Sequence, residues 1–302
     1  MAAVRESVME SPTVFVLGAG ASNPFGFPLG SELKNAMLNH LRNPDFRRVL
    51  HTAGFGNDLI NNFAIALGYS FHPTIDIFLE KKTNFREIGA YVIARSLMPL
   101  EHQLQNLFPQ KDWYGDLFTA MDFENEEPDS SLLSIVTLNY DRSLEHFLLK
   151  NIDYNCQHER TDFCHAKRHK IEVVHAHGSL GEYPDVPYGV NVDDLETVRK
   201  AAENIKIVPD RLDDSPDFQK AQEIISKANH IVFLGFGYND RTLSSLMAKT
   251  NPDGKKFYGT SVALDEPTRT RLTEIFGDKI TLGENQDCRQ LLKTIGMTGR
   301  GD

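Results

Sequence analysis

The run Thr13-Val14-Phe15-Val16-Leu17 leads directly into Gly18-Ala19-Gly20-Ala21-Ser22. An unbroken apolar, β-rich run that ends in glycine is typical of a parallel strand buried on both faces of a sheet. The same arrangement returns where His230-Ile231-Val232-Phe233-Leu234 leads into Gly235-Phe236-Gly237. The two runs therefore predict two buried strands of one parallel sheet.

Strand and helix signals alternate over much of the remaining chain. Strands are predicted at 132–137, 171–177, 205–208 and 257–264, and helices at 31–41, 142–150, 218–228, 241–249 and 267–276. Strands separated by helices indicate a parallel sheet that is covered on both faces. The sequence therefore predicts an α/β fold with a Rossmann-like parallel sheet and helices on both faces.

The segment between the first two strands follows a different pattern. From about residue 45 to residue 128, apolar residues recur at helical spacing, which predicts a block of about four or five helices. We therefore expect one domain over residues 1–302. Its Rossmann-like part is predicted at about 12–44 and 130–302, and a helical insertion, or cap, at 45–128.

Composition argues against several classes of protein. The chain has 302 residues, enough for one large domain, and a formal net charge of −10. Proteins that bind nucleic acid through phosphates usually have a basic face, so we expect no direct nucleic-acid binding. No signal peptide and no apolar run of about 18 residues occurs, so no membrane span is expected. Cys156, Cys164 and Cys288 are too few for a disulfide framework, and we expect a cytoplasmic protein.

Four predicted strands end in polar or glycine-rich tails. These tails are residues 18–22, 139–141, 177–179 and 235–240. In an open parallel sheet, ligands bind where the strands end at their carboxyl edge. The four tails together therefore predict a binding site at this edge.

The first and fourth tails are rich in glycine. Without Cβ atoms at Gly18 and Gly20, backbone amides can approach a diphosphate, and the end of the next helix favours negative charge. A glycine pair after a strand is also common in a simple tight turn. The spacing is neither the full dehydrogenase fingerprint nor a P-loop. The fourth tail, residues 235–240, suits the adenosine half of a dinucleotide.

The second and third tails carry side chains suited to catalysis. Asn139 and Asp141 are spaced so that both can point into one pocket, although Asp141 also fits as a cap of the following helix. His177, at a strand tip, is suited to act as a general base. For His175, on the same strand face, we favour a hydrogen-bonded core position over a role in a paired-histidine metal site.

The four tails, in this order, resemble the sirtuin signature. The motifs are Gly-Ala-Gly-Ala-Ser (18–22), Thr-Leu-Asn-Tyr-Asp (137–141), His-Gly-Ser (177–179) and Gly-Phe-Gly-Tyr-Asn-Asp (235–240). They are most similar to the divergent sirtuin-like family of bacterial antiphage defence systems, over about residues 14–240. The large helical segment resembles the cap of the NAD+-hydrolysing members of that family.

The resemblance implies a role for each motif. NAD+ phosphates and ribose would be held by Gly18, Ala19, Gly20 and Ser22, with Gly178 and Ser179 also in the binding site. Asn139 and His177 match the pair required for NAD+ cleavage, and Asp141 matches the acid beside the nicotinamide pocket. Gly235, Gly237 and Asn239 correspond to the adenosine side. We assign Asn139 to orient the ribose and the attacking water, and His177 to act as the base.

The resemblance also implies an activity. Protein-deacylating sirtuins carry paired Cys-x-x-Cys zinc motifs, and this chain has no such pair, so we expect no structural zinc and no deacylation. The segment from Cys156 to His169 contains possible ligands at a spacing that fits no common zinc site. We expect an NAD+ glycohydrolase that takes NAD+ as substrate and gives nicotinamide and ADP-ribose or cyclic ADP-ribose. Its implied role is to deplete NAD+ in antiphage abortive infection.

Three alternatives to hydrolysis stay open. The chain could be a non-catalytic sensor of NAD+ or ADP-ribose, a protein ADP-ribosyltransferase, or a nicotinamide-dependent dehydrogenase. Because uncontrolled NAD+ hydrolysis would kill the host, we expect control from outside the domain. The expected sources are homo-oligomerisation and a defence partner such as a translocase-type ATPase or a nucleotide-processing subunit.

Overall fold

A parallel six-stranded sheet forms the centre of the computed structural model, which describes residues 8–104, 112–121, 132–155, 171–207 and 215–297. The strands are β1 (Thr13–Leu17), β2 (Leu133–Thr137), β3 (Glu172–His175), β4 (His230–Leu234), β5 (Lys256–Gly259) and β6 (Ile280–Leu282). Their order is β3-β2-β1-β4-β5-β6, that of a Rossmann fold, in which the chain reverses direction across the sheet between β1 and β4. The predicted fold class is confirmed.

The two central strands are apolar throughout because helices cover both faces of the sheet. All five residues of β1 and all five of β4 are buried. Val14 and Val16 face an apolar cluster with α11 (Pro216–Lys227), α12 (Asp240–Met247) and α13 (Glu266–Phe276). Phe15 and Leu17 face a second cluster with α7 (Trp113–Ala120), α8 (Ser143–Asn155) and α14 (Cys288–Thr294).

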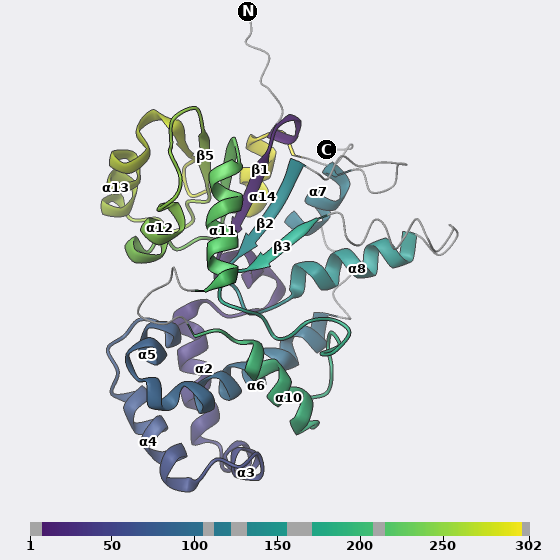
Figure 1. The fold of residues 1–302 in the computed structure, drawn as a ribbon, viewed down its shortest axis with the longest axis vertical. Coiled ribbons are helices and arrows are strands. Elements are labelled where there is room, and N and C mark those ends of the chain that lie inside the picture. The colour runs from purple at the N-terminus through teal and green to yellow at the C-terminus, as the bar shows by residue number, and fades with distance from the viewer. Residues whose placement is uncertain (1–7, 105–111, 122–131, 156–170, 208–214, 298–302) are drawn as a thin grey trace, which may run out of the picture.

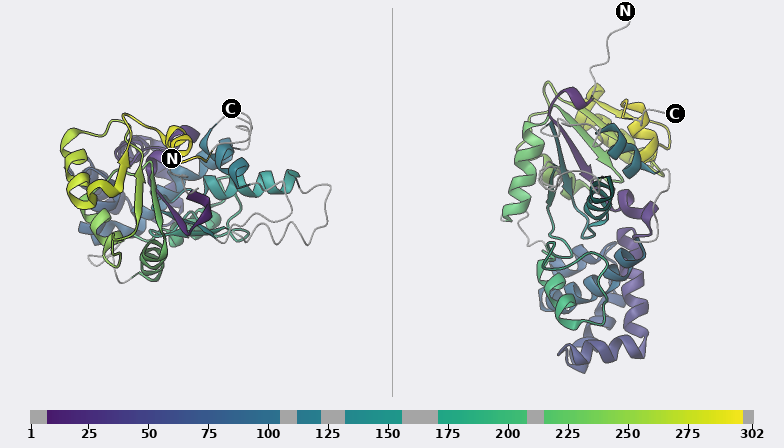
Figure 2. Two further views of the ribbon diagram at one scale, coloured as in Figure 1. Left: turned by 90° about the horizontal axis from the view of Figure 1, so that it is seen from above. Right: turned by 90° about the vertical axis from the view of Figure 1, so that its right-hand side faces the viewer.

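A layer of helices lies below the carboxyl edge of the sheet (Figures 1 and 2). This helical layer consists of α2 (Gly30–Arg42), α3 (Pro44–Thr52), α4 (Asn57–Gly68), α5 (Ile75–Lys81), α6 (Arg86–Leu104) and α10 (Leu195–Asn204). Caps fix several helix starts: the Asn43 side chain accepts from two backbone amides of α3, and that of Thr74 accepts from Ile77 in α5. The layer closes one side of the sheet edge where the four tails end.

Contacts in the helical layer do not follow the predicted boundaries of the insertion. α2, placed by the sequence in the Rossmann-like part, packs against α3, α4, α5 and α6. α10, from much later in the chain, packs against α6. α7, from inside the predicted insertion, packs against α14 and α8 beside the sheet. An independent insertion at 45–128 therefore stays a prediction.

Several predicted elements differ in the structure. The strand predicted at 205–208 is wrong for its described part, because Ile205 forms one isolated bridge with Gly178 and pairing stops where Gly178 turns at φ +72°. The strand predicted at 257–264 ends at Gly259, since Ala263 turns the backbone at φ +53° before Asp265 caps α13. α10, β6 and α14 were not predicted. No helix in the described part of the chain is long and apolar enough to cross a membrane.

Candidate functional site

The glycine tails of β1 and β4 lie against each other at the carboxyl edge. The Gly18 amide donates to Leu234 O and the Gly20 amide to Gly235 O, both at 3.0 Å. A Cβ on Gly18 would lie 2.6 Å from Gly235 O, and Gly235 itself has φ +58°. These glycines are therefore required by the close approach of the two tails. The amides of Gly18 and Gly20, predicted to approach a diphosphate, are engaged within the protein.

A cavity of about 770 Å³ opens beside these tails. Ala19, Gly20, Gly235 and Gly237 line it, as do Tyr238, Thr260 and Trp113. The indole nitrogen of Trp113 donates to Ala21 O at 2.8 Å, which anchors this wall to the first tail. The volume falls in the range of small-molecule and cofactor sites, roughly 300–1,000 Å³. Four positions predicted to bind cofactor, Ala19, Gly20, Gly235 and Gly237, thus line one cavity.

Asn239 does not join that cavity. Its side chain is exposed and accepts hydrogen bonds from the backbone amides of Arg241 and Thr242, so it caps the N-terminus of α12. Ser179 stabilises the turn in which it lies, because its hydroxyl donates to Gly181 O and accepts from the Gly181 amide. Both side chains therefore have local structural roles, and their ligand contacts stay predictions.

Asn139 is held in place through its backbone and its side chain. Its amide nitrogen Nδ2 donates to Gly18 O at 3.0 Å and to Ser22 Oγ at 3.1 Å. Its backbone N–H donates to Thr137 Oγ1 at 3.1 Å. Because Nδ2 carries two hydrogens, both are used, and Oδ1 is the part of the amide left to receive a hydrogen bond from a ligand. The side chain is half-buried and therefore accessible.

Asp141 is buried beside Asn139. Its carboxylate accepts from Ser22 Oγ at 3.0 Å, from the Ser143 backbone amide at 3.2 Å and from Ser143 Oγ. Burial raises the pKa of Asp141 to about 6, against the lowering effect of these hydrogen bonds. Asp141 thus caps the first turn of α8 and also joins the tails of β1 and β2. The helix-cap alternative considered from the sequence is confirmed, and a place for Asp141 in a ligand pocket stays a prediction.

Ser22, Asn139 and Asp141 surround a small internal space. They line a cavity of about 10 Å³ together with Tyr114 and Ser143. Tyr114 OH and Ser143 Oγ are hydrogen-bonded at 2.6 Å, which closes the far side. Such a polar space is close to the minimum that one water molecule requires, about 10–15 Å³.

His177 follows β3 and is half-buried. Its Nε2 is buried and has no hydrogen-bond partner among the described residues, and its ring stacks on Phe218 at 6.3 Å. Burial lowers the pKa of His177, with the negative charge of Asp76 acting in the opposite direction. His177 O accepts from the Lys206 amide at 2.9 Å. A Cβ on Gly178 would lie 2.0 Å from Asn204 O, which explains this glycine.

The tails of β2 and β3 are joined by direct contacts. Leu180 N donates to Tyr140 O at 2.9 Å, and the Tyr140 hydroxyl donates to Asp76 in the helical layer. The structure therefore brings Ser22, Asn139 and Asp141 into one polar cluster. It places His177 on the neighbouring tail and outside the linings of the two cavities described above.

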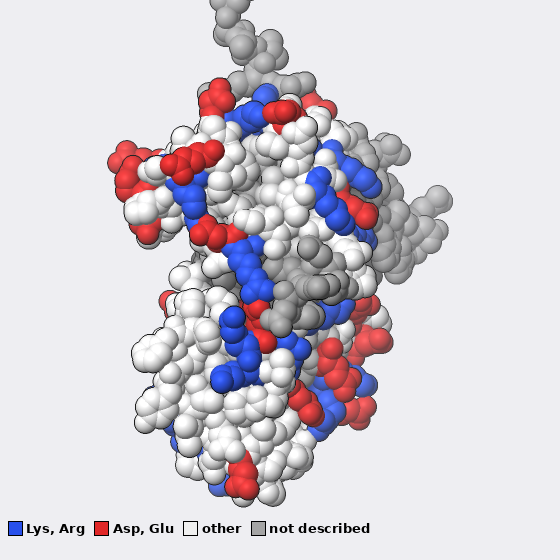
Figure 3. Space-filling view, turned by 60° about the vertical axis from the view of Figure 1, so that its left-hand side comes forward, with Lys and Arg blue, Asp and Glu red and all other residues white. Residues whose placement is uncertain are grey.

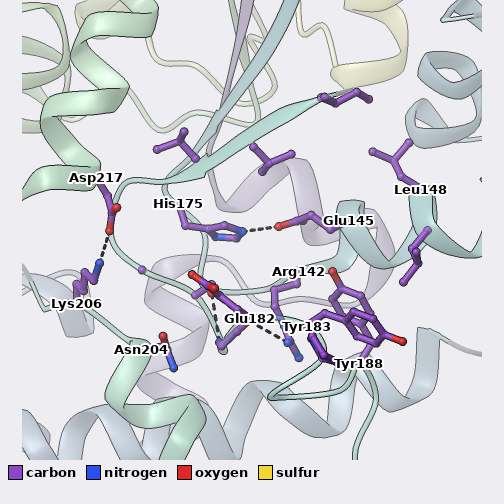
Figure 4. A pocket seen from close by; sticks show the side chains of 18 of the residues that line it. Arg142, Glu145, Leu148, His175, Glu182, Tyr183, Tyr188, Asn204, Lys206 and Asp217 are labelled. Atoms are coloured by element: carbon purple, nitrogen blue, oxygen red, sulfur yellow. Dashed lines mark hydrogen bonds and ion pairs between the residues drawn. The ribbon is translucent and has the colours of Figure 1, made fainter. Parts of the chain in front are cut away.

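One polar pair in this region was not predicted as functional. His175 pairs with Glu145 of α8 and lines a separate cavity of about 680 Å³ at the edge of the sheet (Figure 4). The core position favoured for His175 is thus hydrogen-bonded, as expected, but also opens onto a pocket. Tyr114 was missed as well, because nothing in the sequence near it indicates contact with residues 22 and 143.

The metal and cysteine predictions remain largely untested. Cys156, Cys164 and the histidines near them lie outside the described residues. Within the described residues, no three His, Cys, Asp or Glu side chains are grouped as metal ligands would be. Cys288 is buried and reduced, and burial raises the pKa of its thiol to about 12.

Comparison with known proteins places this site in context. Residues 133–277 match the family model described as SIR2-like domain. Among solved structures, the chain is similar to Sir2Tm bound to a propionylated peptide, with 15% identity and a TM-score of 0.45 over 95% of this chain and 94% of that chain. No curated protein matched the chain.

Proposed function

We propose that this chain, whose residues 133–277 match the family model described as SIR2-like domain, binds NAD+ and hydrolyses the bond between nicotinamide and ribose. The observation that carries this proposal is the polar cluster of Ser22, Asn139 and Asp141. Within it, Asn139 has both amide hydrogens engaged, so its Oδ1 is the amide atom that can accept a hydrogen bond from a ligand. The larger cavity supports the proposal by offering about 770 Å³, room for a ligand of cofactor size, beside the glycine tails of β1 and β4.

The larger cavity fits the adenosine and phosphate parts of NAD+. A Cβ on Gly237 would meet no atom within 4 Å, so a ligand can approach the backbone of this residue closely. Thr260 and Tyr238 supply polar atoms in the wall, while Trp113 supplies an aromatic surface. Since the amides of Gly18 and Gly20 are engaged, we assign phosphate contact to the remaining backbone around Ala19 and Gly237.

The polar cluster fits the chemistry of nicotinamide release. As nicotinamide leaves, positive charge develops on the ribose, as in glycoside hydrolysis. The Oδ1 of Asn139 is an acceptor and can bind a ribose hydroxyl or the attacking water. The carboxyl of Asp141, ionised above pH about 6, stabilises positive charge nearby. His177, whose pKa is lowered by burial, is neutral at pH 7 and can take a proton.

The first experiment follows free nicotinamide and ADP-ribose by chromatography after incubation of the protein with NAD+. We expect release by the wild type and a loss of about 100- to 10,000-fold in His177→Ala and Asn139→Ala, the usual cost of removing a catalytic group. His51→Ala, a change at an exposed histidine of α3, serves as the control. Normal rates in both site variants would contradict the assigned roles.

A second candidate function is NAD+ or ADP-ribose sensing without hydrolysis. It is favoured by the enclosed Nε2 of His177, which must become accessible before it can act as a base. Calorimetric titration with NAD+ separates the two candidates. A sensor would bind NAD+ in wild type and in His177→Ala alike and release no nicotinamide from either.

We further propose that self-association or a protein partner controls the activity, as the defence resemblance implies. Residues 59–74 contain no charged side chain, in a chain of net charge −10. Within this segment Tyr69 is 81% and Phe71 102% exposed, and Figure 3 shows a face of the helical layer with few charges. An uncharged face lets two acidic copies meet without direct repulsion.

Self-association is tested by light scattering after size-exclusion chromatography. We expect an oligomer in the wild type and a smaller species in a Tyr69→Ser/Phe71→Ser variant. Oligomers of equal mass would show that this face is not the contact. A wild type that stays monomeric and inactive would favour a partner protein. Infection assays with His177→Ala test the proposed role in NAD+ depletion.

A further inference from the structure

His175 connects the end of β3 to the backbone of Asn139. Its Nδ1 lies 2.9 Å from Asn139 O, and its Nε2 is hydrogen-bonded to the carboxylate of Glu145 in the first turn of α8. Figure 4 shows the His175 ring and Glu145 directed toward each other among the side chains that line the edge cavity. The two side chains are largely buried, with 14% and 22% of their surfaces exposed.

The two partners of His175 determine its protonation. A backbone carbonyl oxygen can only accept a hydrogen bond, so Nδ1 must carry a hydrogen. A carboxylate likewise only accepts, so Nε2 must carry a second hydrogen, or the Glu145 carboxyl must carry it instead. In either arrangement the pair contains one proton more than a neutral imidazole beside a carboxylate. Loss of that proton would place a lone pair of a His175 ring nitrogen opposite a lone pair of its oxygen partner, and one of the two hydrogen bonds would be lost.

Other charged groups around the pair are mostly paired among themselves. Asp141 acts on His175 from the tail of β2 and favours its charged form. Arg142, at the start of α8, is paired with Glu101 of α6. Around the same cavity, Lys206 pairs with Asp217 and Lys220 with Glu172, and Glu182 completes the lining charges. The charge nearest to His175 is therefore that of Glu145.

We propose that His175 and Glu145 are a positioning pair that holds Asn139 in its active orientation, and that their shared proton sets the upper pH limit of activity. This inference rests on the proposed function. His175 Nδ1 is hydrogen-bonded to the backbone carbonyl of Asn139. The side chain of Asn139 is itself fixed by its hydrogen bonds to Gly18 O and Ser22 Oγ. Without the His175 hydrogen bond, the Asn139 backbone can rotate and carry Oδ1 away from the ligand.

The direction of the pH effect follows from the same contacts. Burial lowers the pKa of His175, but the charge and hydrogen bond of Glu145 outweigh it, and the net pKa is raised. The pair is therefore intact below this raised pKa and is lost as pH rises through it. His177 has a lowered pKa, so its neutral, basic form persists to lower pH. The two histidines together give a bell-shaped profile, with His175 on the alkaline side.

The first test is the pH profile of nicotinamide release in Glu145→Gln, His175→Gln and His175→Ala, with His51→Gln as the control. Glu145→Gln should shift the alkaline fall to lower pH. His175→Gln keeps a neutral donor, so it should lose the alkaline fall while retaining part of the rate. His175→Ala should lower kcat by about 10- to 100-fold with little change in KM, as expected for misplacement of a catalytic group. Alkaline limbs identical to the wild type in all three variants would overturn the proposal.

A second measurement does not depend on turnover. An NMR titration of the His175 ring should give a pKa above the ordinary value of about 6.5 in the wild type and a lower one in Glu145→Gln. A wild-type His175 that titrates at or below its ordinary pKa, or that is unaffected by Glu145→Gln, would overturn the pair. If no nicotinamide is released at any pH, the proposed function fails, while this titration still decides whether the pair exists.

Discussion

The carboxyl of Asp141 is buried, and its hydrogen-bond partners among the described residues, Ser22 and Ser143, carry no charge. Its pKa of about 6 in the folded chain lies above the ordinary 3.8 because burial disfavours the ionised form. Below pH about 4 the carboxyl is neutral in both folded and unfolded chains, so no cost arises. As pH rises from about 4 to about 6, the carboxyl ionises first in the unfolded chain, so the folded state loses stability, and the loss is complete above pH about 6. Retaining such a group is typical of a functional site.

We therefore expect Asp141→Asn to stabilise the protein while it lowers activity. The amide keeps an acceptor for the hydroxyls of Ser22 and Ser143 and removes the buried charge, a gain of roughly 1 to 3 kcal/mol at pH 8. Denaturant unfolding at pH 4 and pH 8 measures the difference, which should be larger at pH 8. A variant that is less stable than the wild type at pH 8 would contradict this account of Asp141.

At the junction between the tails of β1 and β4, glycine can serve close backbone packing or close approach of a ligand. Substitutions at Gly18 and Gly237 separate these two functions. Gly18→Ala places a Cβ against Gly235 O and the Phe236 backbone, atoms that cannot move without shifting β4. We expect a loss of about 2–4 kcal/mol in unfolding free energy, comparable to other severe packing errors. Gly237→Ala meets no atom within 4 Å, so it should leave stability almost unchanged and weaken NAD+ binding only. Gly56→Ala, also in open space, is the control for both measurements.

The strands and helices differ in how well the sequence predicts them. β1 and β4 are identified from single runs because burial on both faces makes every residue apolar. β6 has three half-exposed or exposed residues, so it gives no such run. The apolar face of α10 is explained by α6, a partner distant in the chain. For the same reason the sequence indicates Asn139 and Asp141, which follow one strand, but not the pairing of His175 with Glu145, 30 positions away.

On the scale of the whole molecule, one buried ion pair joins the helical layer to the site. Arg142, next to Asp141, bonds Glu101 of α6 at 2.6 Å and also donates to the carbonyls of Gly181 and Val186 in the segment after His177. The two side chains are 3% and 1% exposed. The guanidinium also lies 4.7 Å from the Tyr188 ring centroid. Through this one side chain, α6, the start of α8 and the loop after β3 are fixed to one another.

Removal of one charge from this pair should therefore affect more than one part of the protein. Glu101→Gln leaves Arg142 charged and buried, which typically costs about 3–5 kcal/mol. In the wild type, unfolding followed by the fluorescence of Trp113, the single tryptophan, should coincide with unfolding followed by circular dichroism. In Glu101→Gln the helical signal should fall at lower denaturant than the Trp113 signal, since Trp113 packs beside the sheet.

The control is Arg48→Gln, which removes an exposed ion pair with Asp45 (76% and 80% exposed) and should change the free energy of unfolding by less than about 1 kcal/mol. Coincident transitions at the wild-type midpoint in Glu101→Gln would show that the ion pair does not couple the helical layer to the sheet.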